Sequence, residues 1–180
     1  MLTPFQIRVK NALKGNPFFG RISDESIRMI RRRSVRRNER IFAKGEPADT
    51  VYGIVSGQVD LFSRGTDGRR ISFGVLGRSE MFGDCGILAE TSRPTNAIAL
   101  RHCELAALMR ADLERLMDRD ATFRDGLLLA SAEMTRRLDE RLDRENFVSI
   151  EARVEKTLFD IARRLGEQPD PDASKIRIRS

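Results

Sequence analysis

The stretch Glu80–Ala99, EMFGDCGILAETSRPTNAIA, combines a glycine-containing turn, a short apolar segment and a single arginine. Gly83 and Gly86 have no side chains, so the backbone N–H groups beside them can approach a ligand closely. A short helix beginning near Asp84 would direct its first amides to the same point, and Arg93 could bind a phosphate in a bidentate manner. A carboxylate there could accept a hydrogen bond from a sugar hydroxyl. The stretch therefore predicts a pocket for a phosphorylated sugar; the alternative is an ordinary Gly-Asp turn followed by a solvated arginine.

The composition is that of a folded protein without a membrane span. Of the 180 residues, 40% are hydrophobic and 33% are charged, which suits one domain of ordinary size or one domain with a helical appendage. No apolar run reaches the roughly 18 residues of a membrane-spanning helix. The N-terminus also lacks the apolar segment of a secretory signal. The sequence therefore predicts a cytoplasmic protein.

Few residues are suited to metal binding or acid–base catalysis. Cys85 and Cys103 are the two cysteines, and their spacing matches no metal motif. His102 is the single histidine and is interpreted as a residue at the end of a strand. No nucleophile–base pair and no paired catalytic carboxylates stand at a recognisable spacing. We therefore expect neither a metal ion nor an enzymatic activity.

The chain is basic, with a formal net charge of +6. This excess is compatible with a polyanionic partner but does not identify one. The densest basic segment is Arg31–Arg37, RRRSVRR. It is interpreted as the solvated face of a helix end and of the strand after it, and direct contact with nucleic acid is the alternative.

From about Ser34 to Met109 the hydrophobic pattern has a period of two, which is typical of strands. Ser56-Gly57 and Asp67-Gly68 are predicted tight turns between strands. The predicted strands cover residues 40–43, 51–55, 58–63, 71–76, 95–101 and 104–109. Short strands at this spacing favour an antiparallel barrel or jelly roll.

Helices are predicted on both sides of this region, at residues 5–14, from Ser23, and at 111–117, 122–147 and 149–164. In the long helix, one apolar stripe is formed by Phe123, Leu127, Ala130, Met134 and Leu138. A neighbouring stripe is formed by Leu128, Thr135, Leu138 and Leu142. One stripe can pack on the barrel while the other meets a second chain in a short coiled coil. The alternative is a monomeric helix packed wholly on its own barrel.

The order of these features resembles the Crp/Fnr family of bacterial transcription regulators. The resemblance is carried, from residue 16 to residue 179, by Asn16–Glu25, Gly45–Gly57, Asp67-Gly68-Arg69, Ser131–Leu138 and Arg153–Gly166. It implies a mainly β fold with helices: a cyclic-nucleotide-binding-like β-roll, which is a double-stranded jelly roll, with flanking helices and a long dimerisation helix.

The resemblance also implies that Phe82–Ala97 binds the phosphate of a cyclic nucleotide, cAMP or cGMP. The residues expected at the ligand are Phe82, Gly83, Asp84, Cys85, Gly86, Arg93, Pro94, Thr95, Arg141 and Leu142. Nucleotide-binding members have Glu in place of Asp84 and Ser or Thr in place of Pro94. Proline has neither a hydroxyl nor a backbone N–H, and aspartate is one methylene shorter than glutamate. These departures leave two alternatives open, a cyclic nucleotide or a different effector or none.

Three parts are expected: a β-roll with N-terminal helices at 1–120, a dimerisation helix at 121–147, and the start of a C-terminal DNA-binding domain at 148–180. Too few residues follow Gly166 for a helix-turn-helix, so the DNA-reading helices are expected outside this sequence. The implied function is the sensor and dimerisation part of a regulator, a homodimer that binds a small effector and controls DNA binding. The alternative is a stand-alone cyclic-nucleotide-binding module that acts through protein contacts.

Overall fold

The computed structural model describes residues 1–65, 67–119 and 121–147, with the side chains of the last helix described up to Arg137. The chain divides into two compact units, Met1–Leu138 and Asp139–Ser180, and the first is described below. The helix predicted at 149–164 lies outside the described residues. The predicted domain boundaries after residues 120 and 147 stay predictions.

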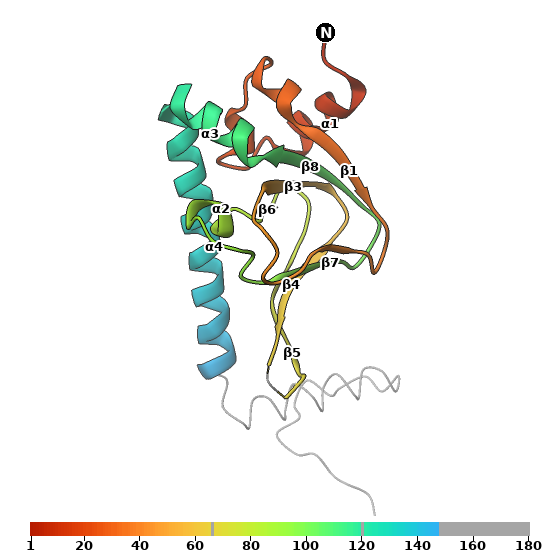
Figure 1. The fold of residues 1–180 in the computed structure, drawn as a ribbon, viewed down its shortest axis with the longest axis vertical. Helices are drawn as coiled ribbons and strands as arrows, with labels where there is room; N and C mark the ends of the chain where they lie inside the picture. The colour runs from red at the N-terminus through yellow and green to blue at the C-terminus, as the bar shows by residue number, and fades with distance from the viewer. Residues whose placement is uncertain (66, 120, 148–180) are drawn as a thin grey trace, which may run out of the picture. The chain divides into compact units, whose positions relative to one another are not determined.

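The first unit is an antiparallel β-roll with helices before and after it (Figure 1). The helices are α1 (Pro4–Leu13), α2 (Cys85–Leu88), α3 (Arg110–Arg119) and α4 (Ala121–Phe147), with short 3-10 turns η1 (Phe19–Arg21) and η2 (Ser26–Met29). The strands are β1 (Arg31–Val35), β2 (Arg40–Phe42), β3 (Thr50–Ser56), β4 (Val59–Arg64), β5 (Arg70–Leu76), β6 (Met81–Phe82), β7 (Asn96–Ala99) and β8 (Cys103–Met109).

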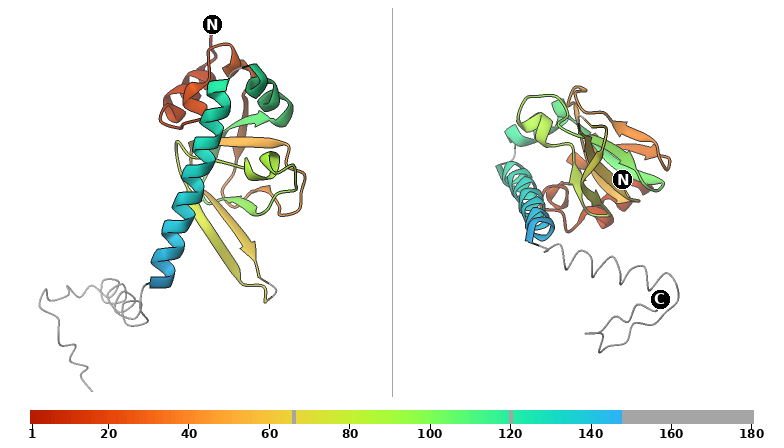
Figure 2. Two further views of the ribbon diagram at one scale, coloured as in Figure 1. Left: turned by 90° about the vertical axis from the view of Figure 1, so that its left-hand side faces the viewer. Right: turned by 90° about the horizontal axis from the view of Figure 1, so that it is seen from below.

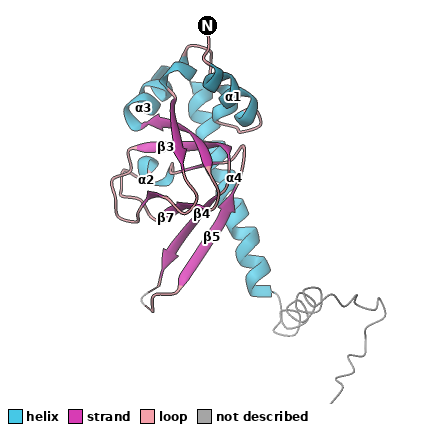
Figure 3. Cartoon of the chain, turned by 90° about the vertical axis from the view of Figure 1, so that its right-hand side faces the viewer, coloured by secondary structure: helices cyan, strands magenta, loops and turns pink. Residues whose placement is uncertain are grey.

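The strands form two four-stranded sheets, in the orders β1-β8-β3-β6 and β2-β7-β4-β5. Neighbouring strands pair antiparallel in both sheets, and β4 and β5 form a hairpin that projects from the roll (Figures 1 and 3). The predicted turn at Ser56-Gly57 is confirmed, because Gly57 has a φ of +97°, which favours glycine. The predicted jelly roll is therefore confirmed.

The strand β3 is buried on both faces, because it separates two apolar clusters. Val51 and Val55 face a cluster that includes side chains of α1, α3 and α4. Tyr52 and Ile54 point to the opposite side, into a cluster between the two sheets. Side chains alternate along a strand, so a strand covered on both faces reads as a continuous apolar run.

The long helix α4 packs on the unit along one face, as predicted. Phe123, Leu127 and Ala130 are buried in the same cluster as the N-terminal segments and α3. The Phe18 and Phe123 rings meet edge to face with their centroids 4.5 Å apart. Figure 2 shows the helix running alongside the β-roll, with α3 and the N-terminal segments at its first turns.

Two predictions at the N-terminal side are wrong. The helix predicted to begin at Ser23 is only the 3-10 turn η2, although the Ser23 hydroxyl does accept a hydrogen bond from the Ser26 N–H. The basic segment predicted to contain a helix end is strand from Arg31 onward. β1 pairs with β8 over its full length, from Arg31 opposite Ala107, so inter-strand hydrogen bonds end the helical turn. As an edge strand, β1 keeps charged side chains in solvent.

Candidate ligand-binding site

Two glycines position the segment that follows β6. Gly83 has a φ of +87°, and a side chain on it would meet the Arg93 Nη1 atom at 2.8 Å. A side chain on Gly86 would meet the Ala48 Cβ atom at 2.6 Å. Both glycines thus allow close packing inside the protein, in addition to the turn geometry that the sequence indicated.

Arg93 is a buried cation with several protein partners. Only 2% of the residue is exposed. Its Nη1 atom donates to the Gly83 carbonyl at 2.8 Å, and Nη2 donates to the Thr50 carbonyl at 2.8 Å and to the Asp49 carboxylate at 3.4 Å. The Nε atom has no hydrogen-bond partner among the described residues. The guanidinium therefore keeps one unsatisfied N–H in a buried position, which is uncommon in folded proteins.

The surroundings of Arg93 are aromatic and partly anionic. Its guanidinium carbon lies 4.4 Å from the centre of the Phe42 ring, a cation–π distance. Burial lowers the pKa of the Arg93 side chain, while Tyr52 and Asp49 raise it. An arginine remains protonated in such a setting, so Arg93 is a fixed positive charge.

A cavity of about 300 Å³ opens beside Arg93. It is lined by Arg33, Ile41, Phe42, Glu46, Pro47, Asp49, Thr50, Tyr52 and Arg93. The Arg33 guanidinium is held at its edge by the Tyr52 hydroxyl, at 2.6 Å, and by the Ile41 carbonyl, at 2.8 Å. This volume is at the lower end for small-molecule pockets.

Asp84 makes its hydrogen bond to a different part of the chain. It precedes the first residue of α2, yet its side chain makes no capping hydrogen bond to that helix. Its Oδ2 atom instead accepts from the Ser131 Oγ atom of α4 at 2.6 Å, and only 4% of Asp84 is exposed. The segment after β6 is thus directly bonded to the long helix.

The other predicted site residues are distributed around these two. Phe82 is buried, and its ring stacks on Tyr52 with the centroids 5.2 Å apart. Cys85 and Pro94 are exposed, and Thr95 is half-buried. Arg141 and Leu142 lie on α4 beyond the side chains that the structure describes. The structure therefore brings Phe82, Gly83 and Arg93 together, while the Asp84 carboxylate faces α4.

The sequence did not identify several residues of this region. Asp49, Thr50 and Tyr52 lie within the Gly45–Gly57 stretch that carries the family resemblance, and that stretch was the one signal for them. Ser131 belongs to the Ser131–Leu138 stretch of the same resemblance, but nothing in the sequence indicated its bond to Asp84, because the two residues are 47 positions apart.

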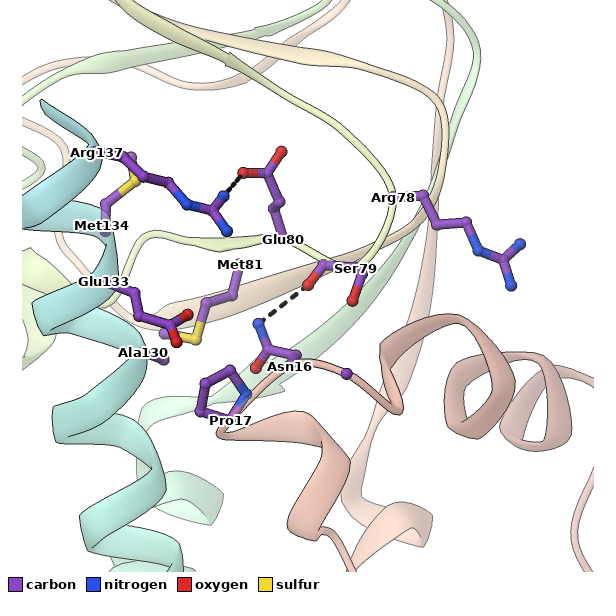
Figure 4. A pocket seen from close by; sticks show the side chains of 11 residues that line it. Asn16, Pro17, Arg78, Ser79, Glu80, Met81, Ala130, Glu133, Met134 and Arg137 are labelled. Carbon is purple, nitrogen blue, oxygen red and sulfur yellow. Dashed lines mark hydrogen bonds and ion pairs between the residues drawn. The ribbon is translucent and has the colours of Figure 1, made fainter. Parts of the chain in front are cut away.

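A second cavity, of about 370 Å³, lies between the N-terminal segment, the turn before β6 and α4 (Figure 4). The Asn16 side chain donates to the Ser79 carbonyl at 3.1 Å, and Arg137 pairs with Glu80 across the opening. Its lining has charges of both signs, from Arg78, Glu80, Glu133 and Arg137. None of the predicted site residues lines it.

The part of the chain that the structure describes contains no cluster of metal-ligand side chains and no helix that could cross a membrane. Within residues 1–65, 67–119 and 121–147, no group of three or more His, Cys, Asp or Glu side chains is arranged to hold a metal ion. No helix among the same residues is long and apolar enough to cross a membrane.

Comparison with known proteins gives consistent matches. The family of cyclic nucleotide-binding domains matches residues 32–120. The chain is 31% identical, over 132 residues, to a CRP-like cAMP-activated global transcriptional regulator of Mycobacterium tuberculosis, covering 73% of this chain and 59% of that protein. It is 30% identical, over 155 residues, to a cyclic AMP receptor protein of Thermus thermophilus, covering 84% of this chain and 72% of that protein.

Solved structures agree with the fold. The catabolite activator protein of Thermus thermophilus superposes with a TM-score of 0.62 at 29% identity, covering 82% of this chain and 71% of that one. The N-terminal domain of a transcriptional regulator from Streptomyces coelicolor superposes with a TM-score of 0.58 at 27% identity. The chain spans 59% of the length of the Mycobacterium tuberculosis regulator.

Proposed function

The chain belongs to the Crp/Fnr family of CRP-like transcription regulators, and from this premise we propose that its β-roll is an effector sensor. The effector class is a cyclic nucleotide, bound at the segment from Phe82 to Thr95. Binding at this segment changes the position of α4, and α4 in turn controls DNA binding by a homodimer. The relatives from Mycobacterium tuberculosis and Thermus thermophilus support the effector class, since both are named for cyclic AMP.

The observation that carries this proposal is the buried guanidinium of Arg93. Burying a cation is costly unless it is compensated, and such groups cluster at functional sites. Arg93 is 2% exposed, has an unpartnered Nε–H, and borders a cavity of about 300 Å³. A cyclic phosphate would give this cation a second anionic partner, besides Asp49, in a charge-assisted hydrogen bond.

Two residues are expected to lower the affinity of the site for a cyclic nucleotide. Pro94 has no hydroxyl and no backbone N–H to offer a phosphate. Asp84 reaches less far than a glutamate would, and its carboxylate already accepts from Ser131. Each missing hydrogen bond costs about 1–3 kcal/mol, so two such losses amount to about a hundredfold or more in affinity.

Titration calorimetry with cAMP and with cGMP tests the proposal on the wild type and on the double variant Asp84→Glu/Pro94→Ser. We expect weak binding to the wild type and stronger binding, by about a hundredfold, to the double variant. Arg93→Ala should abolish binding in both backgrounds. Tight binding by the wild type would contradict our interpretation of Pro94, and no binding by either protein would contradict the effector class.

A stand-alone module that acts through protein contacts is the second candidate. The observation that favours it is a group of exposed apolar side chains on β5, where Ile71, Phe73 and Val75 are 56%, 37% and 51% exposed. The register of β5 against β4 shifts between Leu61 and Phe62, so Ile71, opposite Ser63, and Val75, opposite Asp60, lie on opposite faces of the hairpin. A full-length reading frame that encodes a helix-turn-helix after Ser180 would favour the regulator, and a stop codon there would favour the module.

A further inference from the structure

We propose that Ser131 is a positioning residue of the effector site. Its hydroxyl donates a hydrogen bond to the Asp84 carboxylate until a hydroxyl of the ligand replaces it. This inference rests on the proposed function and adds its regulation. Ser131 lies on α4, so the same displacement that admits the ligand releases a contact of the helix. The site and the helix are then coupled by one hydrogen bond for which two donors compete.

The direction of the Asp84 side chain is the first support. An aspartate immediately before a helix commonly accepts hydrogen bonds from the first amides of that helix. Asp84 makes no such bond to α2, and its Oδ2 atom accepts from Ser131 Oγ at 2.6 Å. A hydroxyl-to-carboxylate bond of this length belongs to the strong, charge-assisted class. The Asp84 carboxylate is therefore hydrogen-bonded to α4 and not to α2.

Burial of Asp84 is the second support. With 4% of the residue exposed, Asp84 is closed off by its protein neighbours. A buried carboxylate that loses a donor is costly, so the Ser131 hydroxyl can leave only when another donor replaces it. A sugar hydroxyl of a bound ligand is such a donor.

The position of Ser131 along α4 explains why its release would matter. Before it, Phe123, Leu127 and Ala130 are buried against the rest of the unit. After it, Met134 is partly buried against the cluster between the two sheets, and Arg137 forms an ion pair with Glu80. The Asp84–Ser131 bond thus lies between the apolar contacts of Ala130 and Met134, and its loss would weaken the attachment of α4 to the roll at that point.

Competition between the Ser131 hydroxyl and the ligand for Asp84 predicts that loss of a site residue's hydroxyl raises the affinity for the ligand. Removing the hydroxyl in Ser131→Ala should make cAMP bind more tightly, by about tenfold, because the ligand no longer displaces a bound donor. Ser131→Thr keeps a hydroxyl at the same position and should restore the wild-type affinity. Ser56→Ala, at an exposed serine at the end of β3, makes the same chemical change away from the site and serves as the control.

Two measurements on the full chain test this together: calorimetry with cAMP, and hydrogen exchange of the amides in α2 and in residues 131–137. In the absence of ligand, Ser131→Ala should exchange several-fold faster than the wild type in both segments. Saturating cAMP should accelerate the same amides in the wild type and change them little in Ser131→Ala. Ser56→Ala should match the wild type in both measurements.

The outcomes separate this inference from the proposed function. Equal or weaker cAMP binding by Ser131→Ala, with binding by the wild type intact, overturns the competition and leaves the effector class standing. No cAMP binding by any variant overturns the effector class, and the competition for a nucleotide with it. Unchanged exchange in ligand-free Ser131→Ala overturns the link between Asp84 and α4 in either case.

Discussion

Arg93 and Asp84 are both buried and charged, but their partners differ in kind. Arg93 is bonded to the backbone carbonyls of Gly83 and Thr50, which belong to the roll itself. Asp84 is bonded to a side chain of α4. The cation is thus held by groups of the roll, and the carboxylate is held by a group of α4. Under the proposed function, this difference suits Arg93 to binding the effector and Asp84 to passing the signal to α4.

A second buried carboxylate, Glu104 on β8, joins three elements. It accepts from the Arg8 side chain of α1, with Nη2 at 2.8 Å, and lies 2.6 Å from the Arg32 Nε atom of β1. The hydrogen bond from Arg8 is the main cause that holds the pKa of Glu104 below its usual value, with Arg32 adding to it. The charged form of Glu104 therefore stabilises the folded state.

Glu104→Gln should lower the free energy of unfolding by about 1–2 kcal/mol at pH 7, since two arginines lose a carboxylate partner that is itself largely buried. A folded-state pKa below the unfolded one gives stability that is fully present above about pH 4.5 and is lost as the pH falls through the folded-state value. Urea unfolding between pH 7 and pH 3 should thus show a steeper loss in the wild type. The exposed Glu25→Gln is the control, and equal slopes in wild type and Glu104→Gln would contradict the role of this carboxylate.

At the scale of the element, α4 has two faces with different partners. The face with Phe123, Leu127 and Ala130 is buried within the unit, as the first predicted stripe requires. On the second stripe Leu128 is 59% exposed and Thr135 is also exposed, while the side chains of Leu138 and Leu142 lie outside those described. Large exposed leucines on a helix favour a further partner, and dimerisation through this stripe stays a prediction.

Leu128→Asp should convert a dimer into monomers, because it would place an unpaired charge in an apolar seam at a cost of several kcal/mol. Sedimentation at tens of micromolar, about the range in which a weak dimer persists, measures the change. Leu129→Asp makes the same substitution on the adjacent exposed leucine, off the predicted seam, and should leave the dimer intact. A wild-type monomer at this concentration would rule out the seam, and dissociation by Leu129→Asp alone would move it to the neighbouring face.

At the scale of the whole molecule, the basic charge is distributed over structural contacts. Within the segment Arg31–Arg37, Arg32 pairs with Glu104 and Arg33 is bonded to Tyr52 and the Ile41 carbonyl. The segment is an edge strand and the turn after it, rather than a helix that could enter a major groove. The net charge of +6 remains as a general attraction for polyanions.

Residues 1–180 should therefore bind DNA weakly, without sequence preference, and with strong salt dependence. Fluorescence anisotropy with unrelated duplexes at about 50 and 200 mM salt should give similar affinities among duplexes and a large loss at the higher salt. Selective retention of one duplex over competitor DNA at physiological salt would contradict this expectation.

Features set by neighbours along the chain were predictable from the sequence alone. The period-two pattern between Ser34 and Met109 predicted the roll, and Gly57 marked a turn with positive φ. The spacing of Phe123, Leu127 and Ala130 predicted the buried face of α4. Each depends on backbone geometry within a few residues, which is why periodicity and turn chemistry were sufficient. The helix expected at Ser23 failed because pairing of Arg31 with β8 competed with local helix formation.

Contacts between distant segments were decided only by the tertiary structure. Arg93 meets the Thr50 carbonyl across 43 residues, and Asp84 meets Ser131 across 47. No local pattern encodes such a pair, since each partner has an ordinary role in its own element. Whether a buried charge faces a carbonyl, a hydroxyl or a ligand depends on how the sheets and α4 close around it. The sequence thus determined that a cyclic-nucleotide-binding-like roll forms, and packing decided that the Asp84 carboxylate is held by the long helix.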